Sequence, residues 1–144
     1  MRRTLRWLSL IVLTLSLALP SLAQNRKAAD PEADYYKLFR FELPKDEVIE
    51  PGAIEVLPDG KVAVGTRRGE IWMIENAFDK DPKKATFKLY ASGLHEVLGL
   101  AYRDGWLYCM QRCELTKMKD TDGCGRADVF RTVNDDWAIS GDYH

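Results

Sequence analysis

Short apolar runs separated by turn-forming residues recur along the chain from residue 52 to residue 133, and this pattern predicts an all-β fold. Two of the turns are Asp-Gly pairs, Asp59-Gly60 and Asp104-Gly105, which are typical of β-hairpin connections. They lie 45 residues apart, and the runs around them follow one another in the same order. The pattern predicts two units of four strands, at residues 52–57, 61–65, 70–74 and 86–90, and at residues 98–102, 106–110, 114–118 and 128–133.

Four short strands that recur every 40–45 residues or so are typical of β-propeller blades. We expect an incomplete propeller at residues 35–144, with blade one at about 52–90, blade two at about 98–133 and a lead-in to blade three at 134–144. Two meanders of another all-β fold are the alternative. Because a propeller needs roughly four to eight blades to close, we interpret the chain as an N-terminal fragment whose missing C-terminal blades complete the ring. Assembly of two-blade chains into a ring is the other interpretation.

The N-terminal residues 1–23 differ from the rest of the chain. Three arginines in the first six residues precede an almost unbroken apolar run from Trp7 to Leu19, and small residues follow at Ser21 and Ala23. This order predicts a secretory signal peptide, because the apolar run is short for a membrane span. An uncleaved N-terminal anchor is the alternative. We therefore expect an exported protein, periplasmic or associated with the cell envelope.

Two segments connect the predicted signal peptide to blade one. Residues 24–34 are polar and rich in alanine, and we interpret them as a linker. Residues 35–43 are aromatic and alternate in polarity, which predicts a further strand. Removal of the signal peptide leaves 18 basic against 22 acidic residues, so the charge gives no indication of a nucleic-acid partner.

The chain has three cysteines, Cys109, Cys113 and Cys124. An exported protein meets an oxidising compartment, and the odd number leaves at least one thiol without an intramolecular disulfide. The close pair, Cys109 and Cys113, lacks the C-x-x-C-H pattern of haem attachment and has no zinc-ligand partners at suitable spacing. Whether this pair forms a disulfide or remains two free thiols stays open.

The acidic segment from Asp120 to Asp128 resembles a calcium-binding loop. Acidic residues occupy its first, third and ninth positions, and a glycine at the sixth permits a sharp turn. Cys124 stands at the fifth position, where an oxygen ligand is expected, and no flanking helices are predicted, so the segment is not an EF-hand. We predict a structural calcium ion held by the carboxylates of Asp120, Asp122 and Asp128 and the carbonyl of Arg126.

In a blade, the first and third connections lie at one end and the second connection at the other. The Asp-Gly turns and the acidic loop therefore share an end. The opposite end is predicted to collect polar residues from several loops, which is a common arrangement for a binding or catalytic site. We expect His95 and Glu96 to act there in catalysis, with the histidine as general base, and Arg67, Arg68, Arg112 and His144 to bind the substrate or a cofactor.

The motifs around the two Asp-Gly turns resemble those of a known family. Residues 57–62 and 68–72, followed by Gly93 and by Leu98-Gly99-Leu100-Ala101, are similar to the start of the soluble quinoprotein glucose/sorbosone dehydrogenases. A closer similarity is to the large exported "membrane-bound dehydrogenase" proteins of planctomycete-type bacteria, which carry stretches like Asp120-Thr121-Asp122-Gly123 and Gly141-Asp142-Tyr143-His144. The resemblance covers residues 35–144.

This resemblance implies a six-bladed propeller that binds pyrroloquinoline quinone and calcium and oxidises aldose sugars. In the planctomycete-type proteins, helical repeats and a haem c domain often follow. Two departures limit what can be carried over. The glutamine that faces the cofactor in the family has no match in Gly93-Leu94-His95-Glu96, and Cys124 stands where relatives have aspartate. The family's catalytic histidine and its cofactor-binding lysine and arginine fall mostly beyond residue 144.

Three functions follow from these patterns. The first is a sugar or alcohol dehydrogenase whose complete form passes electrons to a quinone or a haem, the fragment alone being inactive. The second is a non-catalytic propeller that binds a glycan or a protein. The third is a calcium-dependent, lactonase-like hydrolase, for which the chain shows no convergent set of carboxylate and asparagine ligands.

Overall fold

The computed structural model describes residues 31–139, so the predicted signal peptide and His144 lie outside the described residues. The chain divides into two compact units, residues 1–37 and residues 38–144. The described part of the first unit contains one 3-10 turn, η1 (Pro31–Asp34). All strands of the described residues belong to the second unit.

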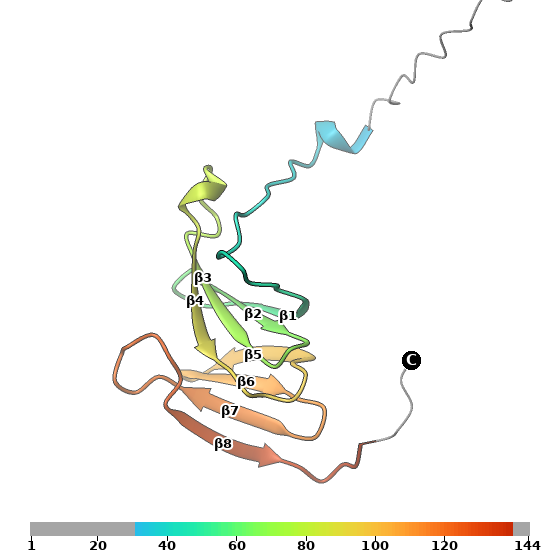
Figure 1. Ribbon diagram of the computed structural model, residues 1–144, viewed down its shortest axis with the longest axis vertical. Helices are drawn as coiled ribbons and strands as arrows, with labels where there is room; N and C mark the ends of the chain where they lie inside the picture. The colour runs from blue at the N-terminus through green and yellow to red at the C-terminus, as the bar shows by residue number, and fades with distance from the viewer. Residues whose placement is uncertain (1–30, 140–144) are drawn as a thin grey trace, which may run out of the picture. The chain divides into compact units, whose positions relative to one another are not determined.

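The second unit contains two antiparallel four-stranded sheets in which each strand pairs with the next along the chain (Figure 1). The prediction of two four-stranded units is thus confirmed. Sheet one consists of β1 (Pro51–Val56), β2 (Val62–Thr66), β3 (Ile71–Glu75) and β4 (Thr86–Ala91). Sheet two consists of β5 (Gly99–Arg103), β6 (Trp106–Met110), β7 (Leu115–Lys119) and β8 (Val129–Asn134). A 3-10 turn, η2 (Pro82–Lys84), precedes β4 and is capped by Asp81.

The strand predicted at residues 35–43 was wrong. These residues form no strand, and the side chains of Tyr35, Tyr36 and Leu38 are 72–96% exposed. Further along, Phe41 packs edge-on against Phe87 of β4, with the ring centroids 6.3 Å apart. An alternating aromatic pattern favours a strand only where a neighbouring strand can pair with it, and this segment has none.

Alternate residues of sheet one face two different environments. Ala63, Ile71 and Met73 join the core that the two sheets share, together with Leu107 and Met118 of sheet two. The residues between them point to the other face of sheet one, which is apolar on all four strands. The strand registers place on that face Ile54, Val56, Val62, Val64, Trp72, Ile74, Phe87 and Leu89. The period-2 pattern of the sequence thus builds a sheet with two apolar faces.

Val97 joins the two sheets. It lies in the β4–β5 connection (residues 92–98), is fully buried, and donates its backbone N–H to the carbonyl of Thr66 at 3.1 Å. A side chain at Gly65 would meet it, since a Cβ there would lie 2.1 Å from Val97 Cγ1. A Cβ at Gly52 would lie 2.3 Å from the Val97 carbonyl oxygen. The two glycines therefore form a slot into which the connection fits.

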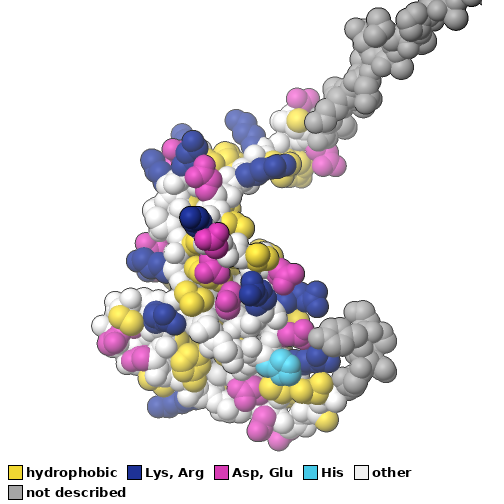
Figure 2. All heavy atoms as spheres, in the orientation of Figure 1, with side chains coloured by type: hydrophobic (Ala, Val, Ile, Leu, Met, Phe, Trp, Pro, Cys, Tyr) yellow, Lys and Arg dark blue, Asp and Glu magenta, His cyan; other side chains and the backbone are white. Residues whose placement is uncertain are grey.

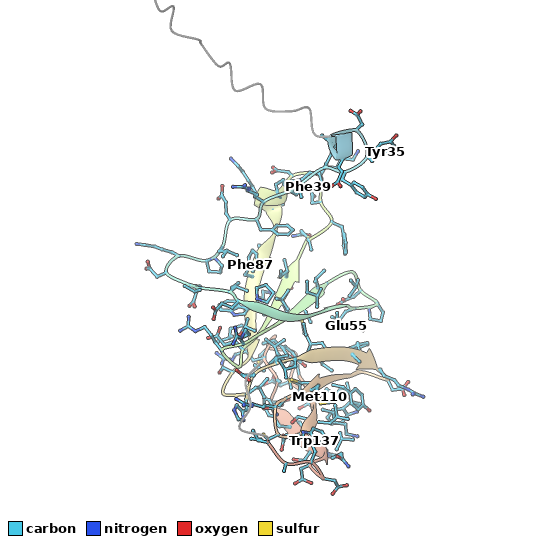
Figure 3. All side chains as sticks on the ribbon, turned by 90° about the vertical axis from the view of Figure 1, so that its right-hand side faces the viewer. Tyr35, Phe39, Glu55, Phe87, Met110 and Trp137 are labelled. Carbon is cyan, nitrogen blue, oxygen red and sulfur yellow. The ribbon has the colours of Figure 1, made fainter. Side chains whose placement is uncertain are left out.

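The sheets meet through their first strands, with β1 lying against β5. Glu55 of β1 extends this contact by accepting a hydrogen bond of 3.0 Å from the backbone N–H of Tyr102 in β5 (Figure 3). Cys109 lies in the shared core, and all three cysteines are free. The disulfide alternative for Cys109 and Cys113 is therefore not realised.

Gly65→Ala is expected to lower the free energy of unfolding by about 1–3 kcal/mol, because the new methyl group overpacks the slot that holds Val97. Denaturant unfolding measures the change. In a double-mutant cycle, Gly65→Ala combined with Val97→Ala should cost less than the sum of the single variants. Gly99→Ala is the comparison: its Cβ would lie 3.3 Å from Met110 Cβ, a milder overlap, so it should destabilise the protein less than Gly65→Ala does. Additive effects of the two substitutions on the free energy of unfolding would contradict a direct contact between position 65 and the Val97 side chain.

Stability should decrease as the pH rises from about 9 to about 12. Burial raises the pKa of Cys109 from 9.0 to about 12, and burial, with Asp120 acting in the same direction, raises the pKa of Tyr90 from 10.0 to about 12. Both groups keep their protons in the folded state at a pH where the unfolded chain has lost them, so stability is lost as the pH rises. Urea unfolding across this range tests it, and Cys109→Ala should show a shallower dependence. Equal slopes for the two proteins would contradict the assignment to Cys109.

Candidate functional site

Three of the predicted site residues come together where the β4–β5 connection meets the β6–β7 turn (residues 111–114). The backbone N–H of Arg112 donates to the carbonyl of His95 at 2.9 Å. The backbone N–H of His95 donates to Gln111 Oε1 at 2.6 Å. The guanidinium of Arg112 forms an ion pair with Glu96, with Nη1 and Oε2 3.7 Å apart. The loops that the sequence placed at one end of the blades are thus in direct contact.

The ion pair changes what Glu96 and Arg112 can do. Both side chains are largely buried, at 19% and 21% exposure, and Glu96 adopts a left-handed backbone conformation with φ of 49°. Each of the two side chains thus has an oppositely charged partner within the protein. The His95 side chain is exposed beside this pair. The arrangement therefore presents one accessible imidazole on a loop held by backbone hydrogen bonds.

A network of polar side chains that the sequence did not reveal holds the loop that carries His95. Gln111 is buried, and its Nε2 donates to Glu114 Oε1 at 3.1 Å and to Thr116 Oγ1 at 2.6 Å. Thr116 also contacts Glu114 through its hydroxyl, and Thr132 Oγ1 donates to Glu114 Oε2 at 3.3 Å. The signal in the sequence was Thr116, a polar residue at an inward position of an otherwise apolar alternation. Through the bond that its Oε1 accepts from the His95 N–H, Gln111 fixes the backbone of the loop that carries His95.

Arg67 and Arg68 lie in the β2–β3 turn (residues 67–70), and both are exposed. Neither guanidinium forms an ion pair with another described residue. The turn adjoins the connection that carries His95, since the backbone N–H of Leu94 donates to the Gly69 carbonyl at 3.0 Å. Trp137, which follows β8, reaches the same end and donates its indole N–H to the Arg112 carbonyl at 3.2 Å (Figure 3). The predicted binding residue His144 lies outside the described residues.

The acidic loop folds around its own carboxylates. The two oxygens of Asp120 accept the backbone N–H groups of Gly123 and Gly125, each at 2.8 Å. Asp128 accepts the backbone N–H of Thr121 at 2.8 Å and its hydroxyl at 2.5 Å. These bonds hold the pKa of Asp128 below its usual value. The hydrogen bond from the Cys124 backbone does the same for Asp122. The loop is therefore closed by hydrogen bonds within the protein.

The potential ligand atoms of this loop differ from the predicted set. Asp120, Asp122 and Cys124 have ligand atoms within 4.8 Å of one another, whereas Asp128 lies outside this group. The Arg126 carbonyl, predicted as a ligand, lies 3.9 Å from the Cys124 sulfur. Calcium takes about six to eight oxygen ligands, and a thiol is a soft ligand that suits it poorly. Two carboxylates and a thiol do not fit calcium, and the predicted ion remains a prediction.

Comparisons with family models, with curated proteins and with solved structures give no match to this chain. The resemblance to the quinoprotein dehydrogenases therefore rests on sequence motifs. Among residues 31–139, no helix is long and apolar enough to cross a membrane.

Cys124→Asp should raise the affinity of the acidic loop for calcium, because it places a third carboxylate beside Asp120 and Asp122. Isothermal titration calorimetry with calcium chloride should show a larger heat and a lower dissociation constant for the variant than for the unaltered chain. Cys124→Ser, which supplies an uncharged oxygen, is the matched control and should change the signal little. Identical heats for all three proteins would exclude a calcium site in this loop.

Proposed function

We propose that the chain forms the first two blades of an exported β-propeller of the quinoprotein sugar dehydrogenase type, whose complete form oxidises a sugar or a sugar-like alcohol. The observation that carries the propeller part of this proposal is the packing of two sequential four-stranded antiparallel sheets through their first strands, β1 and β5. The sugar dehydrogenase type is supported by the sequence motifs around the two Asp-Gly turns. Neighbouring propeller blades pack face to face with the first strand of each innermost, so this arrangement supports the proposal.

Equivalent hydrogen bonds in the two sheets support an internal repeat. In sheet one the backbone N–H of Thr66 donates to the carbonyl of Glu70 at 2.8 Å, across the turn between the second and third strands. In sheet two the backbone N–H of Gln111 donates to the carbonyl of Glu114 at 2.8 Å, at the corresponding place but across a turn that is one residue shorter. Each sheet also has a β-bulge where its third and fourth strands pair, near Ile71 and near Leu115. Repeating blades are expected to repeat such details.

The apolar face of sheet one that points away from the core shared with sheet two is a further argument for a propeller, because another blade could pack against it. Ile54 and Val56 are 64% and 53% exposed there, beside an apolar groove whose walls include Phe41, Ile49 and Phe87. An exposed apolar face of this kind marks a contact surface. In a closed propeller the last blade would cover it.

His95 is the residue that we propose to serve the reaction from this chain. It stands exposed on a loop fixed by Gln111 and Arg112, and an imidazole is suited to proton transfer near neutral pH. The described residues do not fit pyrroloquinoline quinone by themselves. Arg112 is paired with Glu96, and no glutamine stands in the Gly93–Glu96 segment. Other blades would have to supply the quinone site.

The protein encoded by the complete reading frame should reduce an artificial electron-accepting dye in the presence of pyrroloquinoline quinone, calcium and an aldose. His95→Ala should lower the turnover number by about 10²-fold or more, since a positioned acid or base contributes roughly that much. Arg103→Ala, at the opposite end of sheet two, is the control and should leave turnover unchanged. Absence of both cofactor binding and dye reduction would overturn the proposal, and glycan binding without turnover would favour a non-catalytic binding propeller.

A further inference from the structure

A cavity of about 500 Å³ lies between the two sheets, at the end that carries the Asp-Gly turns. It is away from the His95 loop, because Gly105 of the β5–β6 turn lines it, whereas Gln111 and Arg112 follow the other end of β6. The volume is within the range of roughly 300–1,000 Å³ that is usual for small-molecule sites. Neither the sequence patterns nor the proposed reaction uses this cavity.

The floor and walls of the cavity combine apolar and aromatic side chains from both sheets. Met73 of β3 and Leu107 of β6 belong to the shared core and form the floor with Leu57. Tyr90 of β4 and Tyr102 of β5 also line the cavity. Burial raises the pKa of Tyr90 from 10.0 to about 12, so its phenol stays protonated well above physiological pH. Met73 and Leu107 are almost fully buried, at 7% and 1% exposure, so the floor offers a ligand a small apolar contact beneath a polar rim.

Most of the charges at the rim are already neutralised by a neighbour. Lys61 forms an ion pair with Asp59, with Nζ and Oδ2 3.0 Å apart. Lys88 forms an ion pair with Glu75, with Nζ and Oε1 3.2 Å apart. These four side chains contribute no net charge, and their hydrogen-bonding groups are partly engaged. They give the rim polarity without a preference for a cation or an anion.

Two lining charges have no oppositely charged partner. Lys119 forms no ion pair with another described residue, and its ammonium lies 5.9 Å from the centre of the Trp106 ring. It also lies beside Gly105, 3.6 Å from where a Cβ on that glycine would stand. Asp120 accepts backbone N–H groups from Gly123 and Gly125. Its charge acts on Lys61 at a distance but forms no ion pair with it.

The cavity therefore presents one unneutralised cation, one unneutralised anion and an apolar floor. We propose that it binds a zwitterionic small molecule, an α-amino acid with an apolar side chain. Lys119 attracts the ligand carboxylate, Asp120 attracts the ligand ammonium, and the side chain packs on Leu57, Met73 and Leu107. Lys119 and Asp120 are both half-buried, and a ligand with a single charge would pair with only one of them, so it should bind less tightly than a zwitterion. This site is independent of the proposed dehydrogenase reaction.

The test is isothermal titration calorimetry of the chain with L-leucine. Saturable heat is expected with L-leucine, and at least about tenfold weaker binding with leucinamide, which lacks the carboxylate, and with 4-methylpentanoate, which lacks the ammonium, since tenfold corresponds to about 1.4 kcal/mol. Glucose should give no heat. Equal binding of all three leucine-like compounds, binding of glucose alone, or no heat with any ligand would overturn the proposal.

Two variants locate the site. Lys119→Met and Asp120→Asn should each weaken L-leucine binding at least tenfold. Lys117→Met is the matched control, because Lys117 is on the same strand and lies over the same Trp106 ring at 4.9 Å, but does not line the cavity. It should bind like the unaltered chain. Circular dichroism and denaturant unfolding check that each variant folds, and Lys119→Gln replaces Lys119→Met if the latter does not. Unchanged affinity in a folded Lys119 variant would overturn the assignment, and neither result bears on dye reduction.

Discussion

The fit of Val97 into a slot formed by Gly52 and Gly65 is the constraint on which the rest of the second unit depends. Each sheet alone would expose a broad apolar face, and a single four-stranded meander gains stability only by covering such a face. Val97 is fully buried and hydrogen-bonded to Thr66, so it fixes the connection between the sheets as well as their separation. A side chain at either glycine would push the sheets apart. The two glycines leave room for Val97, which packs in the same core as Ile71, Met73 and Leu107.

The contact of Val97 with Gly52 and Gly65 also determines which side chains come together at each end of the two sheets. Because the β4–β5 connection is held at Thr66 and Gly69, its His95 comes next to the β6–β7 turn and its hydrogen-bonding groups. At the other end the sheets separate enough to leave a cavity lined from both. Figure 2 shows basic and acidic side chains interspersed over the visible face of the second unit, so local pairing, not a large single-sign field, determines which charges remain available.

Alternation and turn chemistry were sufficient to predict the eight strands, but not every extended segment. The two Asp-Gly pairs both mark hairpins, although their backbones differ: Asp104 and Gly105 both have positive φ, at 51° and 77°, whereas of the first pair only Gly60 does. Residues 35–43 carried an equally regular pattern and yet form no strand. Periodicity reports which side chains could share a face. It does not report whether a partner strand exists to complete the hydrogen bonds.

The candidate sites were less predictable than the fold because function depends on which charges are neutralised. From sequence alone, Arg112 was expected to bind the substrate or a cofactor and Glu96 to act in catalysis, and the structure pairs their side chains with each other. Asp120 was assigned to a metal ion, yet both of its oxygens accept backbone N–H groups and its side chain also borders the cavity. Lys119 had no role in any motif, and it is the cavity-lining cation that lacks an ion pair. Whether a charged side chain can bind a ligand depends on whether a neighbouring side chain already pairs with it. Those neighbours come from segments far apart in the sequence.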